Sequence, residues 1–252
     1  MRYEVADGVA TLMLDNPDAR NVLDVDTMAA LSEGLVQACE DPAVRVIVLT
    51  AEGRAFCAGA DLKGAASADA DSFTAAGPMG FVAVLEGILD CPKPTIARVQ
   101  GHVAGAGNGL VAACDFAVAA DDVHFAFSEV RVGVAPAVIS VVCLDRMHRR
   151  DGIELLLLGE RVPAARAAQA GLINRAVPRE ELDEVVAGWA EALRKGGPQA
   201  LRTTKELLRK VPLMERTEAF KWTAEISAHT FNSDEAKAGM TAFLSKQPAP
   251  WV

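Results

Sequence analysis

Glycine and alanine crowd one short stretch of this 252-residue chain, Gly101-His-Val-Ala-Gly-Ala-Gly-Asn-Gly109. Four glycines fall within nine residues, and the apolar run that follows has no charged residue until Asp115. Small residues let backbone N–H groups approach a substrate oxygen, and a helix that begins there points the positive end of its dipole at that oxygen. The stretch therefore predicts one half of an oxyanion hole, which requires two donors.

A second turn of small residues supplies a candidate for the other half. The run Gly53-Arg-Ala-Phe-Cys-Ala-Gly-Ala-Asp-Leu-Lys63 directly follows a β-branched segment over 44–50. Glycine clusters by themselves usually mark tight turns. Two such clusters after two predicted strands favour a pair of backbone donors.

The spacing of glycine, histidine and cysteine residues does not fit several other kinds of functional site. Gly105, Gly107 and Gly109 give G-x-G-x-G, but Leu110 stands where a dinucleotide fingerprint requires glycine, so a dehydrogenase is a remote alternative. No phosphate-binding GxxxxGK[ST] motif and no GxSxG nucleophile motif occurs. The four histidines lack HxxxH and HExxH spacing, and the five cysteines lack CxxC, so no metal site is expected.

Composition and charge narrow the possible partners. The 25 Lys and Arg against 34 Asp and Glu give a net charge of −9, which argues against sequence-independent nucleic-acid binding. A local cluster of positive charge could still hold an anionic small ligand. No signal peptide is visible, and no apolar stretch approaches the roughly 18 residues of a membrane span. We expect a cytoplasmic protein with buried free thiols.

Short strands alternate with helices through the first two-thirds of the chain, which predicts an α/β fold. The predicted strands cover 9–14, 44–50, 95–99 and 116–119. A helix is predicted over 27–39 with Asp24 or Asp26 as its N-cap. Residues 64–80 are small and polar and include Gly and Pro, so they predict a mobile surface loop before a helix over 81–89.

The pattern changes after Pro178. Four amphipathic helical patterns follow, near 180–195, 198–210, 213–229 and 233–245. We predict a spiral α/β catalytic core over 1–194 and a helical oligomerisation region over 195–252. The aromatic residues of that second region are too few to form a core of their own and predict an interface; they include Trp222, Phe231, Phe243 and Trp251.

The two glycine-rich turns also carry a family resemblance. GRAFCAGADLK (53–63) and VQGHVAGAGNGLVAACD (99–115) resemble the two signatures of the enoyl-CoA hydratase/isomerase (crotonase) family. Asn16-Pro17, the segment 20–23, FSEVRVGVAP over 127–136 and the segment 159–177 agree in the expected order, so the resemblance spans nearly the whole chain. It implies a crotonase-like spiral of ββα units with a helical C-terminal part. It also implies an acyl-CoA substrate, no separate cofactor, and a homotrimer or a hexamer of two trimers.

The resemblance assigns roles to individual positions. The oxyanion donors would be the backbone amides of Ala60 and Ala106. Backbone of the 58–63 segment would hold the adenine end of coenzyme A, and the 20–23 segment would accept hydrogen bonds from the pantetheine arm, with charged side chains available for the phosphates. The implied coenzyme A contacts are Ala58, Asp61, Leu62, Lys63, Val22, Leu23 and Arg20.

Only one of the two carboxylates used by many family hydratases is present. The first matching position is Gly109, which has no side chain, and the second is Glu129. One base beside an oxyanion hole can activate water for addition to a 2-enoyl thioester, or it can move a double bond from the 3- to the 2-position. We expect hydration, because the 128–140 segment resembles a single-glutamate hydratase branch.

Two alternatives to hydration stay open, a Δ3-Δ2 enoyl-CoA isomerase and a non-catalytic acyl-CoA-binding member of the family. The sequence does not define the length or branching of the acyl chain. Its pocket is expected to draw on 64–80, 81–89 and 134–142, with Arg131 or Arg146 available for a carboxylated acyl group.

Overall fold

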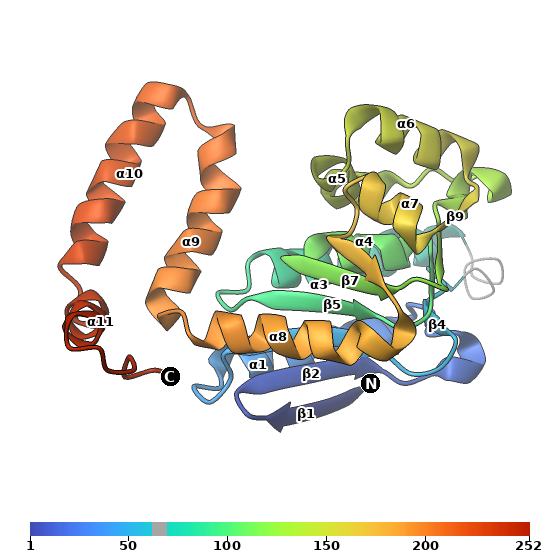
Figure 1. Ribbon diagram of the computed structural model, residues 1–252. Coiled ribbons are helices and arrows are strands. Elements are labelled where there is room, and N and C mark those ends of the chain that lie inside the picture. The colour runs from blue at the N-terminus through green and yellow to red at the C-terminus, as the bar shows by residue number, and fades with distance from the viewer. Residues whose placement is uncertain (62–69) are drawn as a thin grey trace.

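Two β-sheets share the successive turns of the chain in the computed structural model, which describes residues 1–61 and 70–252 (Figure 1). The larger sheet has the order β1-β2-β3-β5-β7-β10 and is parallel except for the β1–β2 hairpin. The smaller has the order β4-β6-β8-β9, with β9 antiparallel to β8. The strands are β1 Arg2–Ala6, β2 Val9–Leu14, β3 Val46–Ala51, β4 Ala55–Cys57, β5 Thr95–Val99, β6 His102–Ala104, β7 Phe116–Ala120, β8 His124–Ala126, β9 Arg161–Pro163 and β10 Arg175–Val177.

The chain crosses between the sheets in a repeating order. From β3 it passes to β4 and then to helix α3, and from β5 to β6 and then to α4; β7 and β8 repeat the pair of strands. Each turn therefore adds one strand to each sheet, which confirms the expected spiral of ββα units. The helices are α1 Val25–Glu40, α3 Ala70–Leu89, α4 Ala106–Ala113, α5 Ala137–Arg146, α6 Arg149–Leu158, α7 Ala164–Gln169, α8 Leu182–Arg194, α9 Pro198–Lys210, α10 Arg216–Phe231 and α11 Asp234–Leu244.

Most elements predicted from the sequence are present. The four predicted strands correspond to β2, β3, β5 and β7. Helix α1 begins after Asp24, whose side chain accepts a hydrogen bond from the Thr27 amide at 2.7 Å, as expected of an N-cap. The four C-terminal patterns correspond to α8, α9, α10 and α11. All six residues of β3 are buried, because side chains of α1 and α3 lie against Ile47 and Leu49 and because α8 also contacts the strand.

The predicted loop over 64–80 is wrong for the part of it that the structure describes. Residues from Ala70 onward belong to α3, with Pro78 inside the helix. The glycines near this segment allow close packing of α3 on α1: a Cβ atom at Gly80 would lie 3.7 Å from Met28, and one at Gly87 would lie 3.5 Å from Leu35. Glycine here serves contact between two helices, and alanine-rich sequence favours helix.

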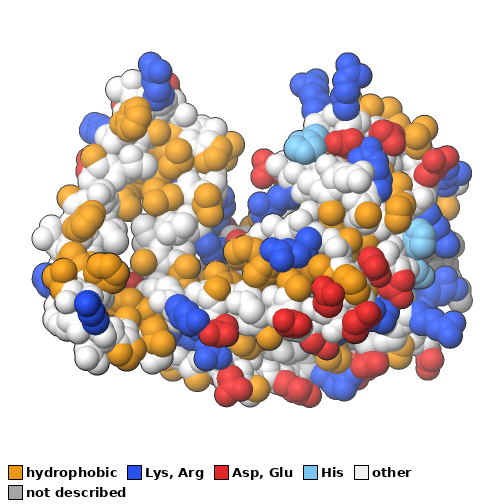
Figure 2. Space-filling model, viewed as in Figure 1, with side chains coloured by type: hydrophobic (Ala, Val, Ile, Leu, Met, Phe, Trp, Pro, Cys, Tyr) orange, Lys and Arg blue, Asp and Glu red, His pale blue; other side chains and the backbone are white. Residues whose placement is uncertain are grey.

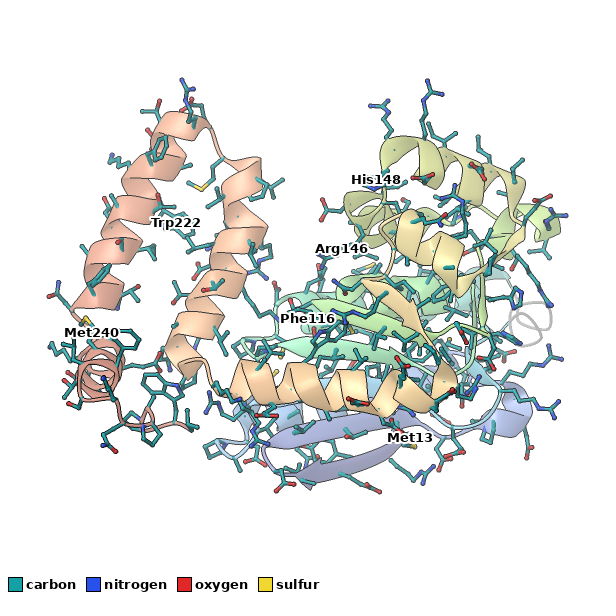
Figure 3. The ribbon with its side chains drawn as sticks, viewed as in Figure 1. Met13, Phe116, Arg146, His148, Trp222 and Met240 are labelled. Carbon is teal, nitrogen blue, oxygen red and sulfur yellow. The ribbon has the colours of Figure 1, made fainter. Side chains whose placement is uncertain are left out.

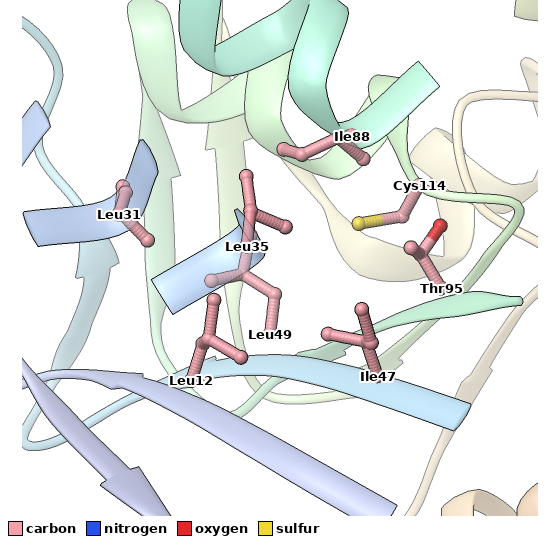
Figure 4. Close-up of a pocket in the computed structure, with 8 residues that line it drawn as sticks. All are labelled: Leu12, Leu31, Leu35, Ile47, Leu49, Ile88, Thr95 and Cys114. Carbon is pink, nitrogen blue, oxygen red and sulfur yellow. The ribbon is translucent and has the colours of Figure 1, made fainter. Parts of the chain in front are cut away.

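The core lies between α1, α3 and the larger sheet. Figure 4 shows a small gap there, lined by residues from β2, α1, β3, α3 and the segments around β5. Its volume is about 10 Å³ and its lining is almost entirely apolar, so it is a packing gap too small for an acyl chain. The lining residues are Leu12, Leu31, Leu35, Ile47, Leu49, Ile88, Thr95 and Cys114.

Helices α9, α10 and α11 form an arm that stands away from the two sheets (Figure 1). None of their residues is buried, and hydrophobic side chains cover much of the arm in Figure 2. Phe231 is 66% and Phe243 82% exposed, whereas the indole of Trp251 donates to the Lys195 carbonyl at 3.0 Å. The division into 1–194 and 195–252 coincides with the end of α8 and stays a prediction. Across the described ranges, no helix is both long and apolar enough to span a membrane.

Candidate active site

Three neighbouring strands of the smaller sheet deliver the candidate catalytic residues. Ala60 follows β4, Ala106 follows β6 and Glu129 follows β8, and these three strands run parallel to one another. Their carboxyl ends therefore meet at one edge of the sheet, the usual location of a ligand site in parallel α/β structures. The structure thus gathers three residues that are far apart in sequence.

The turn before Ala60 requires glycine. Gly59 has a φ of +98°, a conformation that other residues rarely adopt. The turn is held by the neighbouring 20–23 segment, because Leu23 donates its amide to the Gly59 carbonyl at 2.9 Å and Arg20 accepts from the Ala58 amide at 3.0 Å. Ala60 itself is exposed, so its amide lies at an accessible surface.

The turn before Ala106 is built in a similar way. Gly105 has a φ of +52° and precedes α4, whose first residue is Ala106. An N–H group at the first helical position has no partner inside its own helix. A Cβ atom at Gly59 would lie 3.5 Å from the Ala106 nitrogen, so the two turns are in direct contact. The two candidate donor segments are therefore adjacent, as an oxyanion hole requires.

Two buried asparagines fix these turns. Asn108 donates through Nδ2 to the Gly105 carbonyl at 3.1 Å and to the Ala126 carbonyl at 2.9 Å. Asn21 donates to the Glu52 and Ala55 carbonyls at 2.9 and 2.8 Å. Asn108 therefore joins the end of β8 to the turn before Ala106, whereas Asn21 joins the 20–23 segment to the start of β4.

Glu129 lies beside the Gly105 turn. A Cβ atom at Gly105 would be 3.7 Å from Oε1 of Glu129. Its other oxygen, Oε2, is buried and has no hydrogen-bond partner within the described ranges. Burial raises the pKa of the Glu129 carboxyl above the ordinary value of 4.5. A carboxylate in this state accepts a proton more readily than an exposed one, which suits a general base.

The position of the missing carboxylate is filled by apolar side chains. A Cβ atom at Gly109 would lie 2.7 Å from Cγ2 of Ile139 on α5 and 3.2 Å from Cζ of Phe81 on α3. Both of these side chains are buried. Glycine at 109 is therefore required by the packing, and no room for a second acid is left at this position.

The structure places most of the predicted coenzyme A contacts together. Arg20 is exposed, Val22 is half-buried, and Leu23 forms an isolated parallel bridge with Ala60. Ala58 and Asp61 flank the same turn. The segments 20–23 and 58–61 therefore lie side by side. Two of the predicted contacts, Leu62 and Lys63, lie outside the described residues.

Both arginines considered for a carboxylated acyl group donate hydrogen bonds to main-chain carbonyls. Arg131 donates to the carbonyls of Gly159 and Leu158 at 2.8 and 2.9 Å, at the end of α6. Arg146, labelled in Figure 3, donates to the Ala112 carbonyl at 3.0 Å, at the end of α4. Both guanidinium groups stabilise helix C-termini. The described part of the chain contains no cluster of three or more side chains suited to a metal ion.

Sequence reasoning did not find the roles of Asn21, Asn108 and Ile139. A signal was present for Asn108, because a polar residue inside the apolar run 103–114 must be hydrogen-bonded if it is buried. For Ile139 no signal was available, since its contact with Gly109 depends on the packing of α5 against α4.

The fold and this site define a class of protein. The family model for enoyl-CoA hydratase/isomerase matches residues 4–252, and the chain belongs to that family. Among its relatives, a Thermus thermophilus protein provisionally named an enoyl-CoA hydratase is 33% identical over 247 residues, covering 95% of this chain and 96% of its own. A carnitinyl-CoA dehydratase of Salmonella typhi is 32% identical over 249 residues, covering 96% and 94%. A crystal structure of enoyl-CoA hydratase from Mycobacterium smegmatis is 33% identical, with a TM-score of 0.94 and coverage of 99% and 98%.

Proposed function

We propose that the protein adds water to the double bond of a 2-enoyl-CoA and releases a 3-hydroxyacyl-CoA. The observation that supports this best is the position of Glu129, a partly buried carboxylate beside the contact between the Gly59 and Gly105 turns. The adjoining surface formed by 20–23 and 58–61 supports the same substrate class, since it can hold the coenzyme A portion. The thioester is the substrate, and the proposed reaction needs no metal or separate cofactor.

The chemistry follows from three groups. The amides of Ala60 and Ala106 hold the thioester oxygen, so negative charge that develops on this oxygen is stabilised and C3 becomes electrophilic. Glu129 takes a proton from water while the water oxygen bonds to C3. The same carboxyl then returns the proton to C2, which restores the carboxylate and completes the addition.

The names of the relatives favour hydration. Both names, enoyl-CoA hydratase and carnitinyl-CoA dehydratase, describe the addition or removal of water at an acyl-CoA. The acyl group of the substrate is left open by this proposal.

A second candidate reaction is isomerisation of a 3-enoyl-CoA to the 2-enoyl-CoA. The observation that favours it is the apolar packing of Ile139 and Phe81 around Gly109, which leaves no second acid there to orient water. In this reaction Glu129 would remove a proton from C2 and return it at C4, with the same two amides stabilising the intermediate.

Absorbance of the enoyl-thioester band separates these reactions. With crotonyl-CoA the band falls if water is added, whereas with 3-hexenoyl-CoA it rises if the double bond moves. Glu129→Gln should lower kcat at least a hundredfold in either case. The matched control is Glu160→Gln, an exposed glutamate that should retain full activity. Silence with both substrates, together with tight binding of coenzyme A, would contradict catalysis and favour the acyl-CoA-binding alternative.

We also propose that the arm formed by α9, α10 and α11 joins copies of the chain into a homotrimer or a hexamer of two trimers. The support is the exposure of Phe220, Phe231 and Phe243, each more than three-fifths accessible in the single chain. Contiguous exposed hydrophobic surface of this kind is typical of protein interfaces.

A further inference from the structure

Two cysteines outside the candidate active site lie in contact. Cys39 is in the last turn of α1, and Cys91 is two residues beyond the end of α3. Their Sγ atoms are 3.0 Å apart, although the residues are separated by 52 positions in the sequence. Formation of a disulfide from this arrangement requires the sulfur atoms to approach by about 1 Å, which side-chain rotation can provide.

The surroundings of Cys39 favour its thiolate. Lys93 donates to the carbonyls of Ala38 and Asp41 at 2.7 and 2.6 Å, so its ammonium group lies at the C-terminus of α1 beside Cys39. Carbonyls at a helix C-terminus would otherwise disfavour a negative charge. Lys205 on α9 is fixed nearby by the Lys93 carbonyl at 2.9 Å and by a carboxylate oxygen of Asp115 at 2.5 Å.

Several ionisable groups act on the pair together. A hydrogen bond from Cys91 lowers the pKa of the Cys39 thiol, and the positive charges of Lys93 and Lys205 act in the same direction. Burial and the neighbouring Glu40 carboxylate oppose this shift. Cys91 keeps its proton because it donates that hydrogen bond and because it is buried. Tyr3, Asp41 and Arg45 complete the charged and titratable groups near the pair.

The other three cysteines provide an internal comparison. Cys57, Cys114 and Cys143 are all buried. Burial raises the pKa of Cys57 and Cys114 to about 12, and it also raises that of Cys143. A buried thiol that keeps its proton reacts slowly with oxidants. Reactivity should therefore be confined to the pair.

We propose that Cys39 and Cys91 form a reversible disulfide when the protein meets a hydroperoxide. The Cys39 thiolate attacks one peroxide oxygen, the O–O bond breaks, and water leaves after protonation, so Cys39 becomes a sulfenic acid. The sulfur of Cys91 then attacks the Cys39 sulfur and displaces its hydroxyl group as a second water. Two thiols lose two electrons in total, and one hydrogen peroxide is reduced to two waters.

The bond would close a loop that contains the Ala60 turn and all of α3. A disulfide over a loop of this length stabilises the folded state mainly by restricting the unfolded chain. We therefore expect the midpoint of thermal unfolding to rise by about 4–8 °C on oxidation and to return on reduction. This inference is independent of the reaction that the enzyme catalyses.

The test is treatment of the full-length protein with hydrogen peroxide, followed by thiol counting and mass spectrometry of its peptides. The expected result is a fall from five free thiols to three, a peptide that links Cys39 to Cys91, and recovery of all five with dithiothreitol. The protein should keep the mobility of a single chain in a denaturing gel without reductant. Equal alkylation of all five cysteines after peroxide would overturn the proposal, and so would a link between two chains.

Two variants test the order of the steps. In Cys91→Ser the serine hydroxyl can still donate to Cys39, so the sulfenic acid should form and accumulate, and dimedone should trap it. In Cys39→Ser the remaining Cys91 should react no faster than Cys114. A faster reaction at Cys91 than at Cys114 in this variant would overturn the assignment of Cys39 as the thiol attacked first. Circular dichroism of both variants checks that each is folded.

Discussion

Glu129 has one carboxylate oxygen, Oε2, that is buried without a hydrogen-bond partner in the described part of the chain. Unsatisfied buried acceptors are rare in folded proteins because each forfeits the hydrogen bonds it makes with water. In the proposed reaction the carboxyl group that carries this oxygen receives the proton that moves between water and C2. Burial of the Glu129 carboxylate therefore destabilises the folded protein and, by raising the pKa, also makes the group a better base.

The destabilisation caused by the buried Glu129 carboxylate can be measured through the dependence of the free energy of unfolding on pH. The pKa of Glu129 is raised in the folded protein, so its contribution to stability is fully present below the unfolded value of 4.5 and is lost as pH rises through the folded value. Glutamine carries no charge at any pH. We expect Glu129→Gln to be more stable than the wild type at pH 7, and this difference to shrink toward pH 4.

Thermal unfolding at the two pH values is the measurement. Glu160→Gln, which changes an exposed carboxylate, is the matched control and should alter stability little at either pH. A Glu129→Gln protein that is less stable than the wild type at pH 7 would contradict the assignment of a strained, partly buried carboxylate.

At the scale of elements, the candidate site depends on three short strands and the turns that follow them. Each of β4, β6 and β8 has only three residues. Asn108 ties the end of β8 to the turn before Ala106, and Asn21 ties the 20–23 segment to the start of β4. Asn108 acts on the turn before Ala106, whereas Asn21 acts on the segment that holds Ala60 and the proposed coenzyme A surface. The two side chains should therefore differ in their kinetic effects.

Alanine substitutions separate these effects. Asn108→Ala removes the side-chain hydrogen bond to each of the Gly105 and Ala126 carbonyls, which then keep only their backbone donors, the amides of residues 108 and 105. The turn before Ala106 should loosen, so kcat should fall by about tenfold to a hundredfold with little change in KM. Asn21→Ala releases the 20–23 segment from the start of β4 and should raise KM for the acyl-CoA in addition to lowering kcat. Each change should also destabilise the protein by about 1–3 kcal/mol. Steady-state kinetics provides the test, and a loss of kcat that is larger for Asn21→Ala than for Asn108→Ala would contradict it.

The same elements show what the sequence could reveal. Strands such as Val46–Ala51 are short runs rich in β-branched residues, and helices such as α1 have both an apolar stripe and an N-cap at Asp24, so local sequence was sufficient to predict them. The three-residue strands carry no such signal, because their pairing depends on residues from other turns of the spiral. The segment from Ala70 was predicted to be a loop because Gly and Pro usually end helices, whereas here α3 includes Pro78 and packs on α1.

The candidate site likewise contains residues that the sequence predicted and residues that it did not. Ala60, Ala106 and Glu129 were found through motifs, and the structure brings these positions together at one sheet edge. The filling of position 109 by Ile139 could not be predicted, since residues 30 apart meet there only through the packing of α5 on α4. The catalytic roles of Ala60, Ala106 and Glu129 stay predictions that the kinetic experiments test.

At the scale of the whole molecule, the arm exposes hydrophobic surface that a single chain does not cover (Figure 2). The arm is joined to the core through Arg45, which donates to the carbonyls of Gly196 and Trp251 at 2.7 and 3.0 Å. The two ends of the arm are thus held to the core by contacts within the chain, whereas its outer helices keep exposed hydrophobic side chains. In Figure 3 the side chain of Trp222 lies on α10 in this arm, and the ammonium of Lys210 stacks over its ring at 5.5 Å.

Phe243→Asp should weaken assembly, because it places a charge on an 82% exposed aromatic position that we assign to the interface. We expect the molar mass from light scattering at micromolar concentration to fall toward that of one chain. Thr241→Asp is the matched control, since residue 241 is two positions earlier and about 200° around the same helix. A wild-type protein that is already a monomer would contradict the proposed trimer or hexamer.

Both proposed oxyanion donors are main-chain groups, and this has a consequence for how such a protein can diverge. Among the ordinary amino acids only proline lacks the N–H, so almost any inherited change at Ala60 or Ala106 preserves the donor. The glycines at 59 and 105, whose conformation other residues rarely adopt, are the positions where a single codon change is most harmful. An acidic side chain can be lost at 129, or gained at 109 once Ile139 and Phe81 are replaced by smaller residues, without removing the two amides that activate the thioester. A duplicated gene of this kind therefore needs few substitutions to exchange one acyl-CoA reaction for another.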